Sequence, residues 1–178
     1  MSRIRTFSGL YVDPLNLKPE DIRLVDIAWP LANKFRYASQ IRQQYTIAQH
    51  SVMVSYLVGE SDAYAGLLHD AAESYLGDIC GPVKPSFPDF IQAENEAMDA
   101  IGLALLLEPS DCYQDVNEAD ILCGDIERAV FHHGLPGVLT DIWKPQRAYE
   151  EFIYRFDDLC PKDLDQRVLA NLQLGYDS

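Results

Sequence analysis

The run at residues 62–74, DAYAGLLHDAAES, constrains the fold most, because Ala and Leu dominate it and no proline interrupts it. Ala and Leu are strong helix formers and Asp62 is a suitable N-cap, so the run predicts an α-helix, which Gly77 would end. Within it, His69 and Asp70 are adjacent, and an imidazole and a carboxylate so placed can reach one cation. The residue four positions after His69 returns to its helix face, which would place Glu73 beside that cation.

Apolar patterns elsewhere in the chain also predict helices rather than strands. Pro19 and the two acids after it mark a helix start, and Pro30 is expected to kink or restart that helix. Further helices are expected over 46–58, 91–107, 116–132, 143–156 and 164–174. Residues 5–14 alternate around a glycine and predict at most a short hairpin. We therefore expect an all-α fold, a compact helical bundle in one domain over residues 1–178.

Composition narrows the class of protein. With 178 residues and 48% hydrophobic content, the chain can bury a sizeable core. The net charge of −14 disfavours long nucleic acids as partners, since these require clustered Lys and Arg. No stretch approaches the roughly 20 apolar residues of a membrane helix, and the N-terminus lacks a signal-peptide pattern, so a cytoplasmic location without a membrane partner is expected. The four cysteines form no Cys-x-x-Cys motif, and reduced thiols are expected.

Two more residues extend the pair at 69 and 70 into a larger set. His50 lies in the expected helix 46–58, and Asp120 lies in the expected helix 116–132. A lone His-Asp pair arises by chance in many chains, but a His, a His-Asp pair and an Asp on successive helical segments are more specific. This order resembles the HD-domain metal-dependent phosphohydrolases, and the resemblance covers residues 36–128.

Within that superfamily, the chain is most similar to small bacterial 5′-deoxynucleotidases and to phage-type HD hydrolases that include deoxynucleoside triphosphohydrolases. The segments that carry this similarity are 45–51, YTIAQHS, and 67–79, LLHDAAESYLGDI. The resemblance implies one divalent metal ion held by His50, His69, Asp70 and Asp120. Mixed nitrogen and oxygen ligation suits Mn, Co, Fe or Ni, tolerates Zn, and suits Mg less.

The resemblance also assigns acids and cations to the reaction. Glu73 and Asp78 match acids that handle protons in the related enzymes, with Asp78 as donor to the leaving group. The alternative for Asp78 is a turn residue that ends the helix. Arg36 and Lys84 match cations near the phosphate, and Arg42 is a third candidate, because phosphoryl transfer requires neutralisation of the non-bridging oxygens. For each cation the alternative is a solvated surface charge.

The expected substrate is a small nucleotide, most of all a deoxynucleotide whose base stacks near Trp29 and Tyr37. Trp29 and Tyr37 belong to a segment that also contains Phe35 and Arg36, so one segment could contact both the base and the phosphate. The alternative is that these aromatic residues, at helical spacing, belong to the core. A 5′-deoxynucleotidase is the first expectation. The alternatives are a deoxynucleoside triphosphate triphosphohydrolase, for example on dATP, then a guanosine-tetraphosphate hydrolase or a non-catalytic nucleotide-binding HD scaffold. A helical interaction protein with structural His and Asp also remains open.

Aromatic residues near the C-terminus predict self-association. They are more numerous than one small core is expected to absorb, which favours a homo-oligomer. The residues concerned are Trp143, Tyr149, Phe152, Tyr154 and Phe156.

Overall fold

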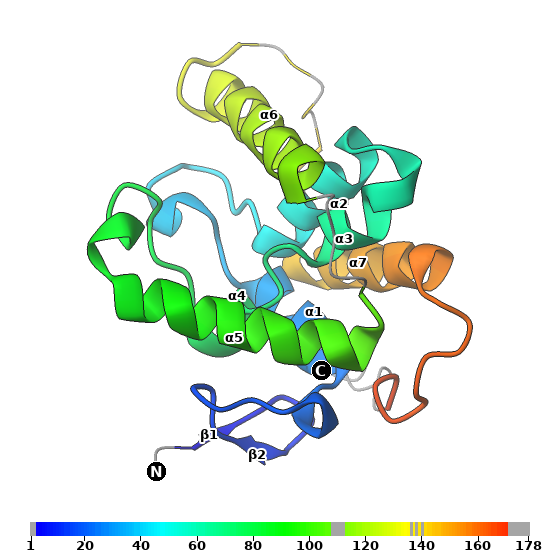
Figure 1. Ribbon diagram of the computed structural model, residues 1–178. Helices are drawn as coiled ribbons and strands as arrows, with labels where there is room; N and C mark the ends of the chain where they lie inside the picture. Colours follow the sequence, from blue (N-terminus) through cyan, green and yellow to red (C-terminus); the bar gives the residue numbers. More distant parts are fainter. Residues whose placement is uncertain (1–2, 108–112, 136, 138, 140, 171–178) are drawn as a thin grey trace. The chain divides into compact units, whose positions relative to one another are not determined.

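The computed structural model describes residues 3–107, 113–135, 137, 139 and 141–170. It is mostly α-helical, which confirms the predicted fold class (Figure 1). The chain divides into two compact units, each built from separated segments. Unit 1 comprises Met1–Leu31, Asp70–Pro109 and Cys160–Ser178, and unit 2 comprises Ala32–His69 and Ser110–Leu159. Within the described ranges, no helix combines the length and the apolar character that a membrane crossing requires.

Unit 1 begins with the expected hairpin. Strands β1 (Ile4–Arg5) and β2 (Tyr11–Val12) pair antiparallel, and Gly9 takes the positive φ of +96° that the connecting turn requires. Ser8 fastens this hairpin to helix α1 (Leu24–Asn33), because its backbone N–H and hydroxyl donate to the buried Asp26 carboxylate at 2.6 and 2.7 Å. Helix α1 continues through Pro30, so the predicted restart there was wrong, whereas the predicted kink stays a prediction.

The rest of unit 1 consists of short helices and one long one. Helix α4 (Glu73–Leu76) ends at Gly77, whose φ is +89°, and a loop leads to the 3₁₀ turn η4 (Lys84–Ser86). Helix α5 (Pro88–Leu105) starts with proline at its first position, where the missing N–H has no helical partner to lose. It contacts η4 and the 3₁₀ turn η1 (Pro19–Asp21).

Unit 2 is organised around helix α2. Helices α2 (Ile47–Leu57), α3 (Ala63–Leu68), α6 (Tyr113–Phe131) and α7 (Pro145–Leu159) form it, and α2 contacts the other three. Gly66 permits the close approach of α3, since a Cβ there would lie 3.0 Å from Val58 Cγ1 and 3.3 Å from Ser55 Cα. The side chain of Gln49 in α2 also binds the backbone before α7, at Asp141 O and Trp143 N.

The predicted continuous helix over 62–74 is divided in the structure. Helix α3 ends at Leu68, residues 69–72 form a turn, and α4 begins at Glu73. In this turn i→i+3 hydrogen bonds appear, such as Glu73 N–H to the Asp70 carbonyl at 3.0 Å. The high intrinsic helix propensity of this run is therefore overridden by its surroundings. His69 ends unit 2 and Asp70 begins the second segment of unit 1.

Two further expectations concern the C-terminal part. The helix predicted over 164–174 is absent from residues 164–170, of which 166–170 form turns, while residues 171–174 lie outside the described ranges. Three of the five aromatic residues used to predict an oligomer, Tyr149, Phe152 and Phe156, are at most 1% exposed in the monomer core. Tyr154 is 70% exposed. The premise of surplus aromatic surface was thus wrong for those three, and the oligomer stays a prediction.

We expect Thr46→Ala to destabilise the protein by about 1 kcal/mol, because Thr46 is the N-cap of α2. Its side chain accepts a hydrogen bond from Gln49 N–H at 3.0 Å, and the residue is fully buried. Urea denaturation measures the loss. Thr46→Ser keeps the capping oxygen and serves as the control. If both variants lose the same stability, the missing methyl group and not the cap is responsible.

Candidate metal site

Three of the four predicted metal ligands converge within unit 2. His50 lies in α2, His69 follows the last residue of α3, and Asp120 lies in α6. Asp120 Oδ1 is 2.9 Å from His50 Nε2 and 3.9 Å from His69 Nε2. The three ligand atoms all lie within 4.8 Å of one another. The His50 side chain is fully buried, whereas those of His69 and Asp120 are 13% and 41% exposed, so the site is reached from the side of these two residues.

The second nitrogen of each imidazole is held by an acceptor. His69 Nδ1 is 2.8 Å from the Gly66 carbonyl, and His50 Nδ1 is 2.6 Å from Glu127 Oε1. A carbonyl and a carboxylate can only accept, so both Nδ1 atoms carry the proton. In the neutral form of each ring the lone pair is then on Nε2, the nitrogen that lies 2.9 Å from Asp120 Oδ1 in His50 and 3.9 Å from it in His69. Two imidazole nitrogens and a carboxylate oxygen so arranged form a donor set for a cation.

The separations also suit a divalent metal ion. Ligand atoms about 2.0–2.2 Å from a zinc-type ion are roughly 3.0–3.5 Å apart, depending on the coordination geometry. The distances of 2.9 and 3.9 Å from Asp120 Oδ1 lie close to this range. The residues therefore fit a metal of the mixed nitrogen and oxygen class, in agreement with the expected cofactor type. The identity of the metal stays a prediction.

The remaining residues of the HD segment belong to unit 1. Asp70, the fourth predicted ligand, follows His69 directly in the chain, and its ligation stays a prediction. Glu73 is 8% exposed and begins α4. The sequence had predicted that Glu73 follows His69 on one continuous helix, and the structure instead places the two residues on either side of a turn. Asp78 is exposed and follows the positive-φ Gly77. This position also fits the alternative of a turn residue.

Lys84, in unit 1, interacts electrostatically with Asp70 and Glu73 of the same unit. Its Nζ is 2.8 Å from Glu94 Oε2, and the two side chains are 32% and 10% exposed. Burial lowers the pKa of Lys84, but the hydrogen bond and charge of Glu94, with the charges of Glu73 and Asp70, outweigh it and raise the pKa. Lys84 is therefore held as a cation near Asp70 and Glu73.

The other predicted substrate contacts are distributed over both units. Trp29 in unit 1 is half-buried and stacks on Phe7, with ring centroids 4.8 Å apart. In unit 2, Arg36 Nε and the Tyr37 hydroxyl donate to Glu127 Oε2 at 3.1 and 2.8 Å. Arg42 is exposed in the loop before α2. Their roles in substrate binding stay predictions.

The turn that carries Tyr37 is strained. Tyr37, Ala38 and Ser39 have φ values of +59°, +47° and +60°. Residues with a Cβ lose about 1–2 kcal/mol each in this left-handed region. Hydrogen bonds hold the turn, from Gln40 N–H to the Tyr37 carbonyl at 2.8 Å and from the Tyr37 hydroxyl to Glu127. Such strain persists only where surrounding contacts fix the backbone.

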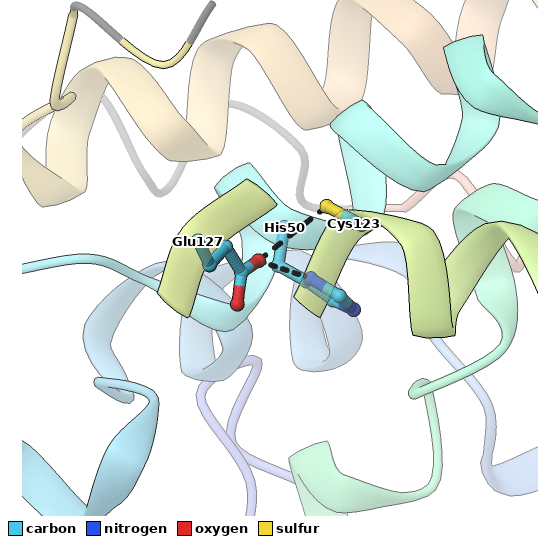
Figure 2. A group of neighbouring side chains, drawn as sticks. All are labelled: His50, Cys123 and Glu127. Atoms are coloured by element: carbon cyan, nitrogen blue, oxygen red, sulfur yellow. Dashed lines mark hydrogen bonds and ion pairs between the residues drawn. The ribbon is translucent and has the colours of Figure 1, made fainter. Parts of the chain in front are cut away.

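Glu127 and Cys123 are site residues that the sequence reasoning missed. In Figure 2 the Glu127 carboxylate faces both the His50 imidazole and the Cys123 thiol. Glu127 Oε1 lies 2.6 Å from His50 Nδ1 and 3.4 Å from Cys123 Sγ. All three side chains are buried. A signal was present: residues 116, 119, 123 and 127 repeat at helical spacing, which places an acid on the apolar face of α6. Burial of an acid on such a face indicates a charged or hydrogen-bonded partner.

The Glu127 carboxylate is ionised despite its burial. Burial raises the pKa of Glu127, but the hydrogen bond from His50, followed by the charge of Arg36 and the hydrogen bond from Tyr37, outweighs burial and lowers the pKa. The same burial and carboxylate raise the pKa of the Cys123 thiol, so that thiol stays protonated. The ionised Glu127 carboxylate therefore accepts the hydrogen bonds from His50, Cys123, Arg36 and Tyr37.

The amino-acid sequence was compared with protein-family models and with known proteins. No family model matches it. The chain is 36% identical over 174 residues to the uncharacterized protein YfdR of Escherichia coli strain K12, a match that covers 89% of this chain and 96% of that protein. It is 32% identical over 137 residues to an uncharacterized protein of Rhodobacter capsulatus, covering 69% of each chain. The similarity to YfdR extends over nearly the whole of both chains, and the chain therefore belongs to the YfdR family.

Proposed function

We propose that the chain is a metal-dependent phosphohydrolase that acts on a deoxynucleotide, as a 5′-deoxynucleotidase. The convergence of one ligand atom each from His50, His69 and Asp120 within 4.8 Å of one another supports this proposal most directly. The resemblance of the His50, His69-Asp70 and Asp120 pattern to HD-domain phosphohydrolases supports the same reaction. In this proposal Asp70 supplies the fourth ligand.

Each group has a chemical task in this reaction. When bound, a divalent ion supplies Lewis acidity at the phosphoryl group and at water. Asp120 and the proposed fourth ligand Asp70 add two negative charges to two neutral imidazoles, so the ligand set balances the charge of a divalent ion. The negative charge of the substrate then has to be met by cationic side chains. The Lys84 ammonium, near Asp70 and Glu73, is proposed to neutralise a non-bridging phosphate oxygen. Arg36 and Arg42 are further proposed phosphate contacts.

A substrate screen tests this function. Purified protein is assayed with ribo- and deoxynucleoside mono-, di- and triphosphates in the presence of Mn, Co, Zn or Mg, and both phosphate and tripolyphosphate are measured. Release of phosphate from deoxynucleoside monophosphates is expected. Tripolyphosphate from a dNTP would replace the monophosphatase by a triphosphohydrolase, and equal rates on ribonucleotides would exclude selection of the sugar. Metal binding without any turnover would leave a nucleotide-binding scaffold.

We expect Glu73→Ala and Asp78→Ala to keep the metal but lower kcat by about 10²–10⁴-fold, the range typical of a general acid or base. Neither residue is among the proposed ligands. Metal content and steady-state kinetics measure the two effects separately. Glu96→Ala, which removes an exposed acid of α5 in the same unit, is the control and should match the parent. Loss of metal in Glu73→Ala would instead make Glu73 a ligand.

A further inference from the structure

We propose that Glu127 is a positioning residue that fixes His50 in the tautomer able to bind a metal ion and joins this ligand to the strained turn 37–39. The inference rests on the proposed metal site. Glu127 Oε1 is bonded to His50 Nδ1, and Oε2 accepts from Arg36 Nε and the Tyr37 hydroxyl. One buried carboxylate thus contacts a proposed ligand and the segment that carries two proposed substrate contacts.

Glu127 does not itself complete a second metal site with His50 and Cys123, although the three side chains are close together. Its Oε1 is 2.6 Å from His50 Nδ1, which is a short hydrogen bond. Two ligand atoms around a tetrahedral zinc would be about 3.3 Å apart, so the cation has no room between them. Arg36 Nε already pairs with the Glu127 carboxylate at 3.1 Å, so the charge of that carboxylate is balanced without a metal ion. The group therefore supports His50.

The effect of this support follows from the chemistry of the carboxylate. Because Glu127 only accepts, the proton of the neutral His50 ring must lie on Nδ1, which leaves the Nε2 lone pair for the metal. The same carboxylate anchors Tyr37, whose backbone is in the left-handed region. Loss of the Glu127 carboxylate should therefore weaken metal binding at His50 and also remove the hydrogen bond that holds Tyr37 in the turn 37–39.

Glu127→Gln tests the tautomer directly, because the neighbours dictate how the amide must point. Arg36 can only donate, so the amide oxygen has to occupy the Oε2 position that accepts from Arg36 and Tyr37. The amide NH₂ then occupies the Oε1 position and faces His50 Nδ1 as a donor. His50 must in turn carry its proton on Nε2, where the lone pair for the metal is lost.

We expect Glu127→Gln to weaken metal binding by about 10–100-fold, as is typical when a group that orients a metal ligand is lost. Isothermal titration of the metal-free full chain with MnCl₂ or CoCl₂ measures the affinity, and circular dichroism checks the fold. Glu118→Gln makes the same change at an exposed position of α6 and should bind like the parent. Unchanged affinity in Glu127→Gln would overturn the proposal.

A combined variant separates positioning from damage to the core. In a background of Arg36→Met and Tyr37→Phe, the two donors to Oε2 are absent, so a Gln at position 127 can turn its oxygen toward His50. Adding Glu127→Gln to this background should then change metal affinity by less than threefold. A further large loss would show that the amide acts by disturbing the core and would overturn the proposal. If the parent binds no metal, the proposed function fails as well, whereas normal parent binding confines the failure to Glu127.

Discussion

His69→Ala is expected to remove the bound metal and reduce turnover to background while the helices remain folded. In the proposed function His69 supplies one of two nitrogen ligands, and its loss leaves one imidazole and two carboxylates, a set of three ligands that binds a divalent ion more weakly. The side chain is 13% exposed and ends a helix, so its removal costs less stability than removal of the fully buried His50 would.

Elemental analysis, nucleotidase activity and circular dichroism of purified His69→Ala measure these effects. His133→Ala removes an exposed histidine that follows α6 and should keep both metal and activity. Stoichiometric metal in His69→Ala, together with activity equal to that of the parent, would contradict the metal site. Loss of the helical signal would point to a structural role for His69.

Phe152→Ala is expected to have the largest effect on stability, a loss of about 3–5 kcal/mol. Phe152 is 0% exposed in α7, which packs on α2 and α3. Truncation leaves a cavity that a close-packed interior fills only in part, so both the transfer free energy of the ring and the contacts around it are lost.

Fluorescence during urea denaturation measures this loss in unit 2. The chain has two tryptophans, so Trp29→Phe leaves Trp143, in the segment before α7, as the single reporter. Tyr154→Ala, on the same helix but 70% exposed, should change stability by about 0.5 kcal/mol or less and is the matched control. If Phe152→Ala and Tyr154→Ala lost equal free energy of unfolding, burial of the Phe152 ring would not be the source of the stability that α7 provides.

The metal ligands depend on the packing of unit 2. His50 lies near the start of the helix that contacts α3, α6 and α7, and Gly66 lets α3 approach it closely enough to present His69. Glu127 and Asp120 come from the same helix, α6, two turns apart. The proposed ligand Asp120 and the positioning residue Glu127 are thus carried by one rigid helix, which fixes the distance between them.

The sequence by itself determined the class of elements and much of the candidate site. Ala- and Leu-rich or amphipathic segments made helices over most of their expected ranges, because local propensity and the spacing of apolar residues agree there. His50, His69 and Asp120 were selected because imidazole and carboxylate groups bind divalent ions wherever a fold brings them together. The structure does bring these three within reach of one another.

Only the tertiary structure decided how those residues are supported. Propensity predicted one helix through residue 69, but the chain passes there from unit 2 to unit 1 and turns. The apolar Leu164 and Val168 are buried without forming a helix, because burial alone does not dictate backbone conformation. Glu127 lies seventy-seven positions from His50, and a contact across that separation arises from packing between helices, which local sequence preferences do not encode.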